Sequence, residues 1–327
     1  MIAITGAAGF IGSNLAHRLA SEGHQLLLVD HELNPAKAAN FVGLPRFAFS
    51  RHDHFLEDLT ANRVAPDAIF HLGACSSTTE TNWDYLFRNN VEYTRRLWEW
   101  ATANRKPFLY ASSAATYGDG SRGFDDYTPP RELKPLNLYG KSKNAFDIWA
   151  IAEETTGQPT PPKWAGLKFF NVYGPRESHK GRMASVVYHT HKQVTTTGEM
   201  KLFRSTDPHL EDGGQRRDFV FVGDCVNHLI WLWKNDATNG VYNSGSGEAR
   251  TFHDLARGVF ASLGLPPRIG FTDMPRDLAG KYQNFTRAEM TKLRAAGCEI
   301  PATPLEDGVS ETVLWLEGRT ESVRRAA

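Results

Sequence analysis

Short apolar runs alternate with stretches of helical spacing along the first half of the chain. The apolar runs cover residues 1–5, 25–29, 67–72, 108–111 and 164–170, and the more polar segment 46–53 is also expected to be a strand. Between these strand-like segments, helical spacing of apolar residues marks three stretches: residues 13–20, residues 85–103 and a segment around 139–143. A run without alternation, such as residues 68–70, is typical of a parallel strand covered on both faces. The order of elements predicts an α/β fold built on a doubly wound parallel sheet.

The C-terminal part of the chain follows another pattern. Helical spacing over residues 252–263, 287–295 and 305–316 predicts a smaller, mostly helical lobe. Residues 219–222 are strand-like and are expected to rejoin the main sheet, before a last short strand at 241–245. The Gly- and Asp-rich segment 207–215 is expected to be a flexible surface loop, and the charged tail after residue 317 is expected to fray.

Composition narrows the class of protein. The 327 residues include 37 Lys and Arg against 37 Asp and Glu, so the net charge of zero gives no reason to expect a nucleic-acid or membrane partner. No apolar run approaches the roughly 20 residues that span a bilayer. Cys75, Cys225 and Cys298 lie far apart without metal-ligand spacing, which indicates reduced thiols, no metal site and a cytoplasmic protein.

A glycine motif follows the first strand directly. Gly6, Gly9 and Gly12 permit a tight turn, close approach to a pyrophosphate and close packing of a helix on the strand. Asp30, at the end of the second strand, is expected to meet the adenosine ribose, and Lys37 can offset its repulsion of a 2′-phosphate, so NAD and NADP both remain open. The motif predicts a dinucleotide-binding Rossmann domain at 1–171 and 218–245, and a substrate domain at 172–217 and 246–327.

The chemistry is expected around Tyr139 and Lys143. They are four residues apart, so on a helix both lie on one face, where the ammonium is expected to lower the pKa of the phenol. Ser113, at a strand end, would complete a Ser-Tyr-Lys set. Each signal alone has a plainer interpretation, because Tyr-x-x-x-Lys is common on exposed helices and Ser113 suits a simple turn.

Two polar segments flank this set. The small, polar loop 71–80 follows a buried strand, where ligands bind in doubly wound sheets, and Asn89 is expected to hydrogen-bond back to it. Arg176, His179, Lys180 and Arg182 form a basic cluster that suits a diphosphate-bearing substrate, although a solvated basic loop would look the same.

The chain resembles the ADP-L-glycero-D-manno-heptose 6-epimerases of the extended short-chain dehydrogenase/reductases nearly end to end. The motifs that carry the resemblance are Gly-Ala-Cys-Ser-Ser-Thr-Thr-Glu (73–80), Ala-Ser-Ser-Ala-Ala-Thr-Tyr-Gly (111–118), Phe-Asn-Val-Tyr-Gly-Pro-Arg-Glu (170–177), His-Lys-Gly (179–181), Met-Ala-Ser-Val (183–186) and Arg-Asp-Phe-Val (217–220). The loop at 73–80 and His-Lys-Gly are the most specific to this family.

The resemblance implies an enzyme that oxidises C6 of an ADP-heptose with bound NADP, with NAD as the alternative cofactor, and returns hydride to the other face. It assigns the two proton-handling roles to Tyr139 and Lys180, with Lys143 and Ser113 assisting. The implied cofactor-binding residues are Gly6, Gly9, Phe10, Ile11, Gly12, Asp30, His31, Lys37, Leu72, Gly73, Ala74, Cys75, Ser76, Asn89, Tyr139, Lys143, Val172 and Lys180. The implied substrate-binding residues are Ser113, Asn171, Arg182, His189, Phe203, Arg204, Ser205, Thr206, Arg217 and Tyr282. Family members assemble into pentamers, which implies a homo-oligomer.

The chain departs from the family pattern at a few positions. Leu72 replaces a glutamate, His31 an asparagine and Arg182 a serine. No counterpart is evident for a second lysine near residue 51, where Arg51 is the nearest cation. These differences bear on NADP preference and on the fit to the sugar.

Three other functions compete with this interpretation. A 4,6-dehydratase would carry an Asp-Glu pair where this chain has Ala114 and Ala115, which argues against dehydration. A nucleotide-sugar 4-epimerase needs the same Ser-Tyr-Lys set but has no evident need for Lys180. A non-catalytic dinucleotide sensor would have no use for a proton relay.

Overall fold

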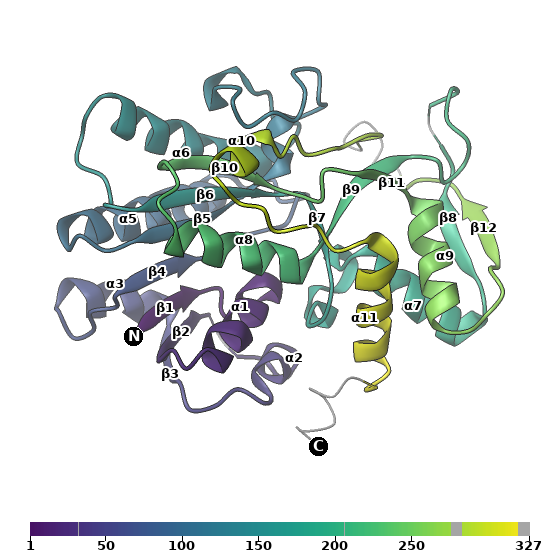
Figure 1. Ribbon diagram of the computed structural model, residues 1–327, viewed down its shortest axis with the longest axis horizontal. Helices are drawn as coiled ribbons and strands as arrows, with labels where there is room; N and C mark the ends of the chain where they lie inside the picture. Colours follow the sequence, from purple (N-terminus) through teal and green to yellow (C-terminus); the bar gives the residue numbers. More distant parts are fainter. Residues whose placement is uncertain (32, 206, 276–282, 320–327) are drawn as a thin grey trace.

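The computed structural model describes residues 1–31, 33–205, 207–275 and 283–319. Its largest element is a seven-stranded parallel sheet in the order β10-β6-β5-β4-β1-β2-β3 (Figure 1). The strands are β1 (Ile2–Thr5), β2 (Leu26–Asp30), β3 (Ala48–Arg51), β4 (Ala68–His71), β5 (Phe108–Ser113), β6 (Trp164–Phe169) and β10 (Gly240–Ser244). The predicted doubly wound α/β fold is confirmed.

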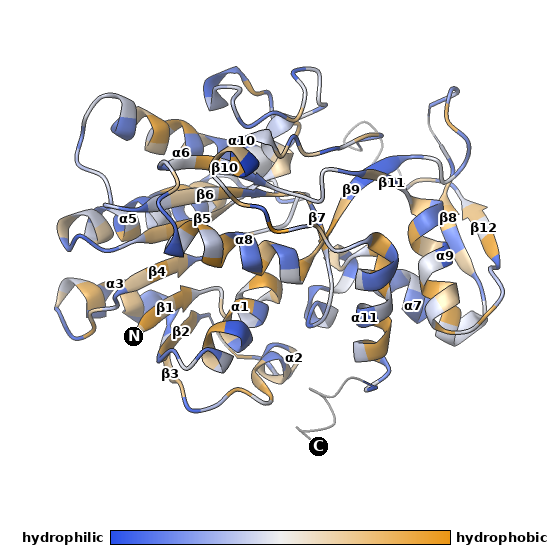
Figure 2. Cartoon of the chain, viewed as in Figure 1, coloured by the Kyte–Doolittle hydropathy of each residue, from blue (hydrophilic) through white to orange (hydrophobic). Residues whose placement is uncertain are grey.

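Helices cover both faces of this sheet. One face is covered by α1 (Phe10–Ser21) and α8 (Val222–Lys234), and the other by α3 (His52–Thr60), α5 (Tyr93–Ala103) and α6 (Leu138–Thr155). Side chains alternate along a strand, so Ile2 and Ile4 pack in the α1/α8 layer while Ala3 packs in the α3/α5 layer. Every residue of β1 is buried, as the unbroken apolar run predicts. Figure 2 shows hydrophobic strands inside and hydrophilic outer helix faces.

The smaller lobe contains helices and two short sheets. Its helices are α7 (Val186–Thr197), α9 (Phe252–Ser262) and α11 (Leu305–Leu316). One sheet is formed by β7 (Asn171–Tyr173), β9 (Arg216–Phe221) and β11 (Ala249–Thr251), and the other by β8 (Met200–Phe203) and β12 (Ile269–Thr272). The remaining short helices are α2 (Pro35–Ala38), α4 (Trp83–Leu86) and α10 (Thr291–Ala295), with turns of 3₁₀ helix at Ala39–Phe41, Ala114–Tyr117, Pro130–Glu132 and Ser178–Met183.

One prediction about the sheet is wrong. Residues 219–221 belong to β9, which pairs with β7 and β11 instead of rejoining the main sheet, and residue 222 opens α8. The reason is that the chain leaves β6 through Phe170 into β7, which provides a parallel partner for β9 at Val172 and Val220. The free edge of β6 is then taken by β10.

The expected helix 85–103 is three segments in sequence, α4, a π-helical turn at Phe87–Glu92 and α5. Turns of π-helix are often found at functional sites, and this one carries Asn90, discussed below. Within the described ranges, no helix has the length and apolarity needed to cross a membrane.

Candidate active site

A cavity of about 1200 Å³ lies between the carboxyl ends of the main strands and the smaller lobe. Its lining comes from the glycine turn before α1, the ends of β2, β4 and β5, the start of α6, β7 and residues 179–186. Pockets for single small ligands usually measure about 300–1,000 Å³. The cavity therefore has room for a dinucleotide together with a second ligand.

The glycine turn has the geometry that a pyrophosphate site requires. Gly6 has φ of +65°, and a Cβ there would lie 2.6 Å from the backbone of Gly73. A Cβ on Gly12 would lie 2.1 Å from the carbonyl oxygen of Gly6, so only glycine lets α1 pack this closely. Gly9 caps α1 without a side-chain hydrogen bond, and the first residues of α1, Phe10–Gly12, line the cavity. The helix N-terminus therefore faces the cavity with free amides and a partial positive charge.

At the end of β2, Asp30 is buried and its charge is balanced. Its carboxylate accepts hydrogen bonds from the Ala8 amide at 2.9 Å, from its neighbour the His31 amide at 2.8 Å and from the Lys37 ammonium at 2.8 Å. A carboxylate with three donors and a paired cation repels a nearby phosphate far less than a bare one. The negative charge at this end of the cavity is therefore largely balanced.

Sequence reasoning missed His52 at the same end. His52 lines the cavity and stacks between His31 at 4.3 Å and Tyr93 at 4.0 Å, measured between ring centroids. Burial and the His31 charge lower the pKa of His52 to about 4. Arg51, the cation singled out from sequence, lies outside the cavity lining and pairs with Asp53 at 3.0 Å. The sequence offered position as its signal, because Arg51 is the last residue of β3 and His52 directly follows it.

The loop after β4 is held by Asn90 and not by Asn89. The Asn90 side chain accepts from the Cys75 amide at 2.8 Å and donates to the Cys75 carbonyl at 3.0 Å and to Ser142 at 2.9 Å. Asn89 lines the cavity but donates to the carbonyl of Tyr85, within its own helix. The π-helical turn shifts the register of the helix face, which sequence spacing at an α-helical period does not reveal.

Ser113, Tyr139 and Lys143 meet in the cavity wall. Asn137 caps α6 by accepting from the Gly140 amide at 2.8 Å, which places Tyr139 in the first turn of the helix, over the end of β5. Tyr139 is hydrogen-bonded to Ser113. The Lys143 ammonium donates to the carbonyl of Ala111 at 2.9 Å. The expected Ser-Tyr-Lys set is therefore assembled from two elements.

The net shift of the Tyr139 pKa is opposite to the one expected from its neighbour Lys143. Burial raises the pKa of Tyr139, and the hydrogen bond with Ser113 only partly opposes this. Burial also lowers the pKa of Lys143 to about 8, against a favourable effect of the Asp147 charge. Loss of hydration destabilises the phenolate of Tyr139 and the ammonium of Lys143. The attraction between these two charges, one helical turn apart, does not compensate for that loss.

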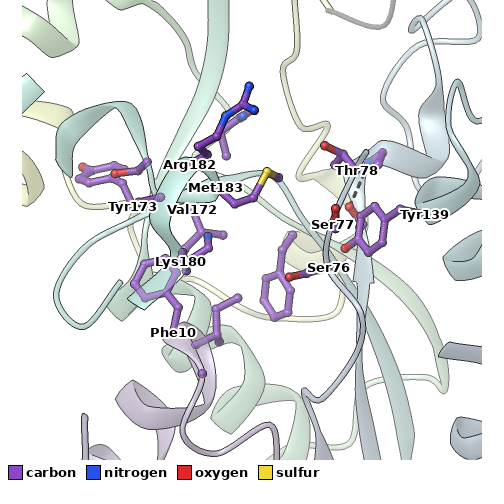
Figure 3. Close-up of a pocket in the computed structure, with 18 of the residues that line it drawn as sticks. Phe10, Ser76, Ser77, Thr78, Tyr139, Val172, Tyr173, Lys180, Arg182 and Met183 are labelled. Atoms are coloured by element: carbon purple, nitrogen blue, oxygen red, sulfur yellow. Dashed lines mark hydrogen bonds between the residues drawn. The ribbon is translucent and has the colours of Figure 1, made fainter. Parts of the chain in front are cut away.

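Lys180 lies on the opposite wall. Figure 3 shows it beside Phe10 and Val172, across the cavity from Tyr139 and Ser76. Its ammonium lies 5.0 Å from the centroid of the Phe10 ring. Burial lowers the pKa of Lys180, and the Glu177 charge partly opposes this. Two groups able to transfer a proton thus face one space from two sides.

The expected substrate-binding residues divide into three groups. Five line the cavity in addition to Ser113: Asn171, Arg182, His189, Phe203 and Arg217. Arg204 and Ser205 do not, because β8 ends at Phe203 and both turn toward Asp212, which pairs with the Arg204 guanidinium at 2.8 Å. Thr206 and Tyr282 lie outside the described residues. Gln193, Lys201 and Gln215 also line the cavity, and no motif in the sequence marked them.

A buried polar cluster supports the wall from behind. Asp147, on α6, accepts from Tyr110 at 2.9 Å and Ser112 at 2.6 Å, both on β5, and pairs with Lys168 of β6 at 3.2 Å. Lys168 also donates to Thr116 at 2.6 Å. The cluster therefore connects the helix that carries Tyr139 to the strand that carries Ser113.

Asp147→Ala is expected to lower the free energy of unfolding by about 3–5 kcal/mol, because it leaves Lys168 buried without its carboxylate. Urea denaturation measures this. As a matched control, Asp58→Ala removes the exposed pair with Arg63 and is expected to cost about 0–1 kcal/mol. Equal losses for the two variants would contradict the assignment of Asp147 as a buried support.

Comparison with known proteins agrees with this geometry. Residues 2–245 match the model of the NAD dependent epimerase/dehydratase family. The chain belongs to this family. ADP-L-glycero-D-manno-heptose-6-epimerase of Nitratidesulfovibrio vulgaris (strain Hildenborough) is 47% identical over 96% of this chain and 97% of its own length. The same-named protein of Alkalilimnicola ehrlichii is 43% identical over 94% and 95% of the two chains.

A solved structure leads to the same family. The crystal structure of Helicobacter pylori ADP-L-glycero-D-manno-heptose-6-epimerase has a TM-score of 0.80 and 27% identity, and covers 97% of this chain and 96% of the other. The resemblance to the heptose epimerases is thereby confirmed. This member of the epimerase/dehydratase family is an epimerase and uses a nicotinamide dinucleotide, for which the glycine turn and the large cavity provide a fitting site.

Proposed function

We propose that this epimerase inverts C6 of ADP-glycero-manno-heptose through a 6-keto intermediate, with tightly bound NADP. The observation that carries the proposal is the placement of Tyr139 and Lys180 on opposite walls of one cavity (Figure 3). Inversion requires that a C–O–H group lose its proton in one orientation and regain a proton in the other. One proton-transfer group on each side meets that requirement.

The nicotinamide, when bound, supplies a reversible acceptor and donor of hydride. On one wall, the Tyr139 hydroxyl exchanges a proton with the C6 oxygen, while Ser113 holds that hydroxyl through its hydrogen bond with Tyr139. The hydrogen bond from the Lys143 ammonium to the Ala111 carbonyl keeps the ammonium at the same wall. These residues hold one geometry of the alcohol and its ketone.

On the other wall, Lys180 exchanges a proton with the C6 oxygen after the side chain of the sugar has turned. The lowered pKa of Lys180 brings its proton transfer nearer to neutral pH, which suits a general acid and base. Arg182, Arg217 and His189 line the substrate side and provide positive charge or hydrogen-bond donors for a diphosphate. The nucleotide is then held while the heptose moves.

The preference for NADP rests on the pair of Lys37 and Asp30. Lys37→Ala is expected to weaken NADP binding relative to NAD by about 10- to 100-fold, since it removes a charged donor and leaves the Asp30 carboxylate unbalanced. Calorimetric titration with both dinucleotides measures this. Arg51→Ala is the matched control and should leave the preference unchanged, because Arg51 lies outside the cavity lining. Equal effects on both dinucleotides would contradict the proposed role of Lys37.

The decisive experiment is turnover. The protein is incubated with ADP-D-glycero-manno-heptose and the two C6 epimers are separated by chromatography. Interconversion supports the proposal, and release of the cofactor for mass spectrometry identifies NADP or NAD. Cofactor binding without interconversion would favour a 4-epimerase or a non-catalytic sensor. Ala114 and Ala115, directly after Ser113, supply no acid or base for dehydration.

A further inference from the structure

Glu177 is buried and lies outside the cavity lining, yet the loop that presents Lys180 is built around it. Its carboxylate accepts from the Ser185 amide at 2.5 Å, from the Ser185 hydroxyl at 2.5 Å and from the Gly174 amide at 3.4 Å. Its own carbonyl accepts from the Lys180 amide at 3.0 Å. One side chain therefore ties together both ends of the segment 174–185, with Lys180 between them.

The charge on Glu177 needs a counterion. Burial raises the pKa of Glu177, whereas the Ser185 hydrogen bonds and the Lys180 charge lower it. A buried carboxylate is costly unless it is hydrogen-bonded and balanced by a cation. A hydroxyl donor at 2.5 Å, as from Ser185, is typical of an ionised carboxylate acceptor. Lys180 is the cation whose charge lowers the pKa of Glu177.

Lys180 is in the complementary situation. The Lys180 ammonium lies over the Phe10 ring, and within the described residues it forms no direct ion pair with Glu177. Burial lowers the pKa of Lys180, and Glu177 is the group that raises it. The two charges thus act on each other through the protein interior, where screening by water is weak.

Other charged groups near this loop act less directly. His179 accepts from the side-chain amide of Asn40 at 3.1 Å. Burial, Lys37 and Lys180 lower the pKa of His179, while Asp30 raises it. Arg182 lies on the same 3₁₀ turn and lines the substrate side. The positive groups outnumber Asp30 here, so they add to the need for Glu177.

We propose that Glu177 is a positioning residue that holds Lys180 at the cavity and stabilises its ammonium form. The inference rests on the proposed role of Lys180 only where it concerns catalysis. The carboxylate never needs to touch the substrate, because it acts through the loop it folds and through its charge on Lys180.

The test is the titration of Lys180 itself. The intact protein is labelled with trace acetic anhydride across a range of pH, and mass spectrometry of the peptides follows Lys180 relative to the exposed Lys141. Glu177→Gln keeps the size of the side chain and an acceptor for Ser185 but removes the charge. It is expected to shift the labelling midpoint of Lys180 downward by about one pH unit.

Two further variants separate charge from packing. Ser185→Ala removes one hydrogen bond to Glu177 and keeps the charge, so the midpoint of Lys180 should stay near that of the unmodified protein. Glu177→Asp also keeps the charge but shortens the side chain, so it tests the positioning role independently of whether the Gln variant folds. It should retain the midpoint but lower kcat more than it changes KM, because the shorter side chain cannot reach both ends of the loop and no longer holds Lys180 in place. An unchanged midpoint in Glu177→Gln, or equal shifts in Gln and Ser185→Ala, overturns the inference.

The same variants keep this inference distinct from the proposed function. In the pH profile of kcat, the limb that belongs to Lys180 should move to lower pH in Glu177→Gln, in step with labelling. A labelling shift without a change in the profile would leave the role of Glu177 standing and remove Lys180 from the reaction. The reverse result, a shifted profile with unchanged labelling, overturns the inference about Glu177.

Discussion

Replacing Tyr139 with phenylalanine is expected to lower kcat by about 10³-fold, the usual scale for loss of a general acid or base. The ring stays in place, so the cavity and cofactor binding are retained. Only the hydroxyl that Ser113 positions is removed. Steady-state kinetics with either epimer, together with calorimetric cofactor titration, measure the two effects separately.

Tyr127→Phe is the control for this experiment. Tyr127 is exposed and lies outside the cavity lining, and its ring contact with Lys292 survives the change. It should behave as the unmodified protein. Near-normal turnover by Tyr139→Phe would mean that the base has been wrongly assigned, whereas loss of cofactor binding would mean that the phenol is structural.

Lys180→Ala is expected to lower kcat by about 10²-fold or more, because one of the two proton-transfer groups disappears. The effect should be on kcat more than on KM, since the proposed diphosphate site uses other cations that line the cavity, such as Arg182 and Arg217. The measurement is the rate of interconversion in both directions. Because epimerisation needs both walls, the loss should be the same in each direction.

The exposed Lys141, on α6, provides the control variant Lys141→Ala, which removes a lysine amine without touching the cavity. A mild effect of Lys180→Ala would favour a scheme in which a single tyrosine serves both faces, as in a 4-epimerase. A large rise in KM with unchanged kcat would instead place Lys180 among the phosphate-binding groups.

Local patterns in the sequence predict much of this architecture. Unbroken apolar runs predict strands buried on both faces, and six of the seven strands of the main sheet follow from the first half of the chain. The prediction that residues 219–221 pair with the main sheet is wrong, because strand pairing depends on which sheet edge is free. The β6 edge was taken by β10, and β7 offered another.

The site shows the same division at the level of single residues. Helical spacing places Tyr139 and Lys143 on one face, because the period of an α-helix is constant. The choice between Asn89 and Asn90 depends on a π-helical turn, and the choice between Arg51 and His52 depends on which side chain turns toward the cavity. Neither departure has a signature in a short window of sequence.

By itself, the sequence determined most of the order of strands and helices, the glycine turn and the candidate catalytic residues, because each depends on neighbours within one turn or one strand. Only the tertiary structure decided that Lys180 faces Tyr139 across the cavity, that Glu177 stands behind Lys180 and that the pKa of Tyr139 is raised. These depend on burial and on charges brought together from distant segments. Hydration and electrostatic interactions act through space, and the distances that govern them exist only in the folded chain.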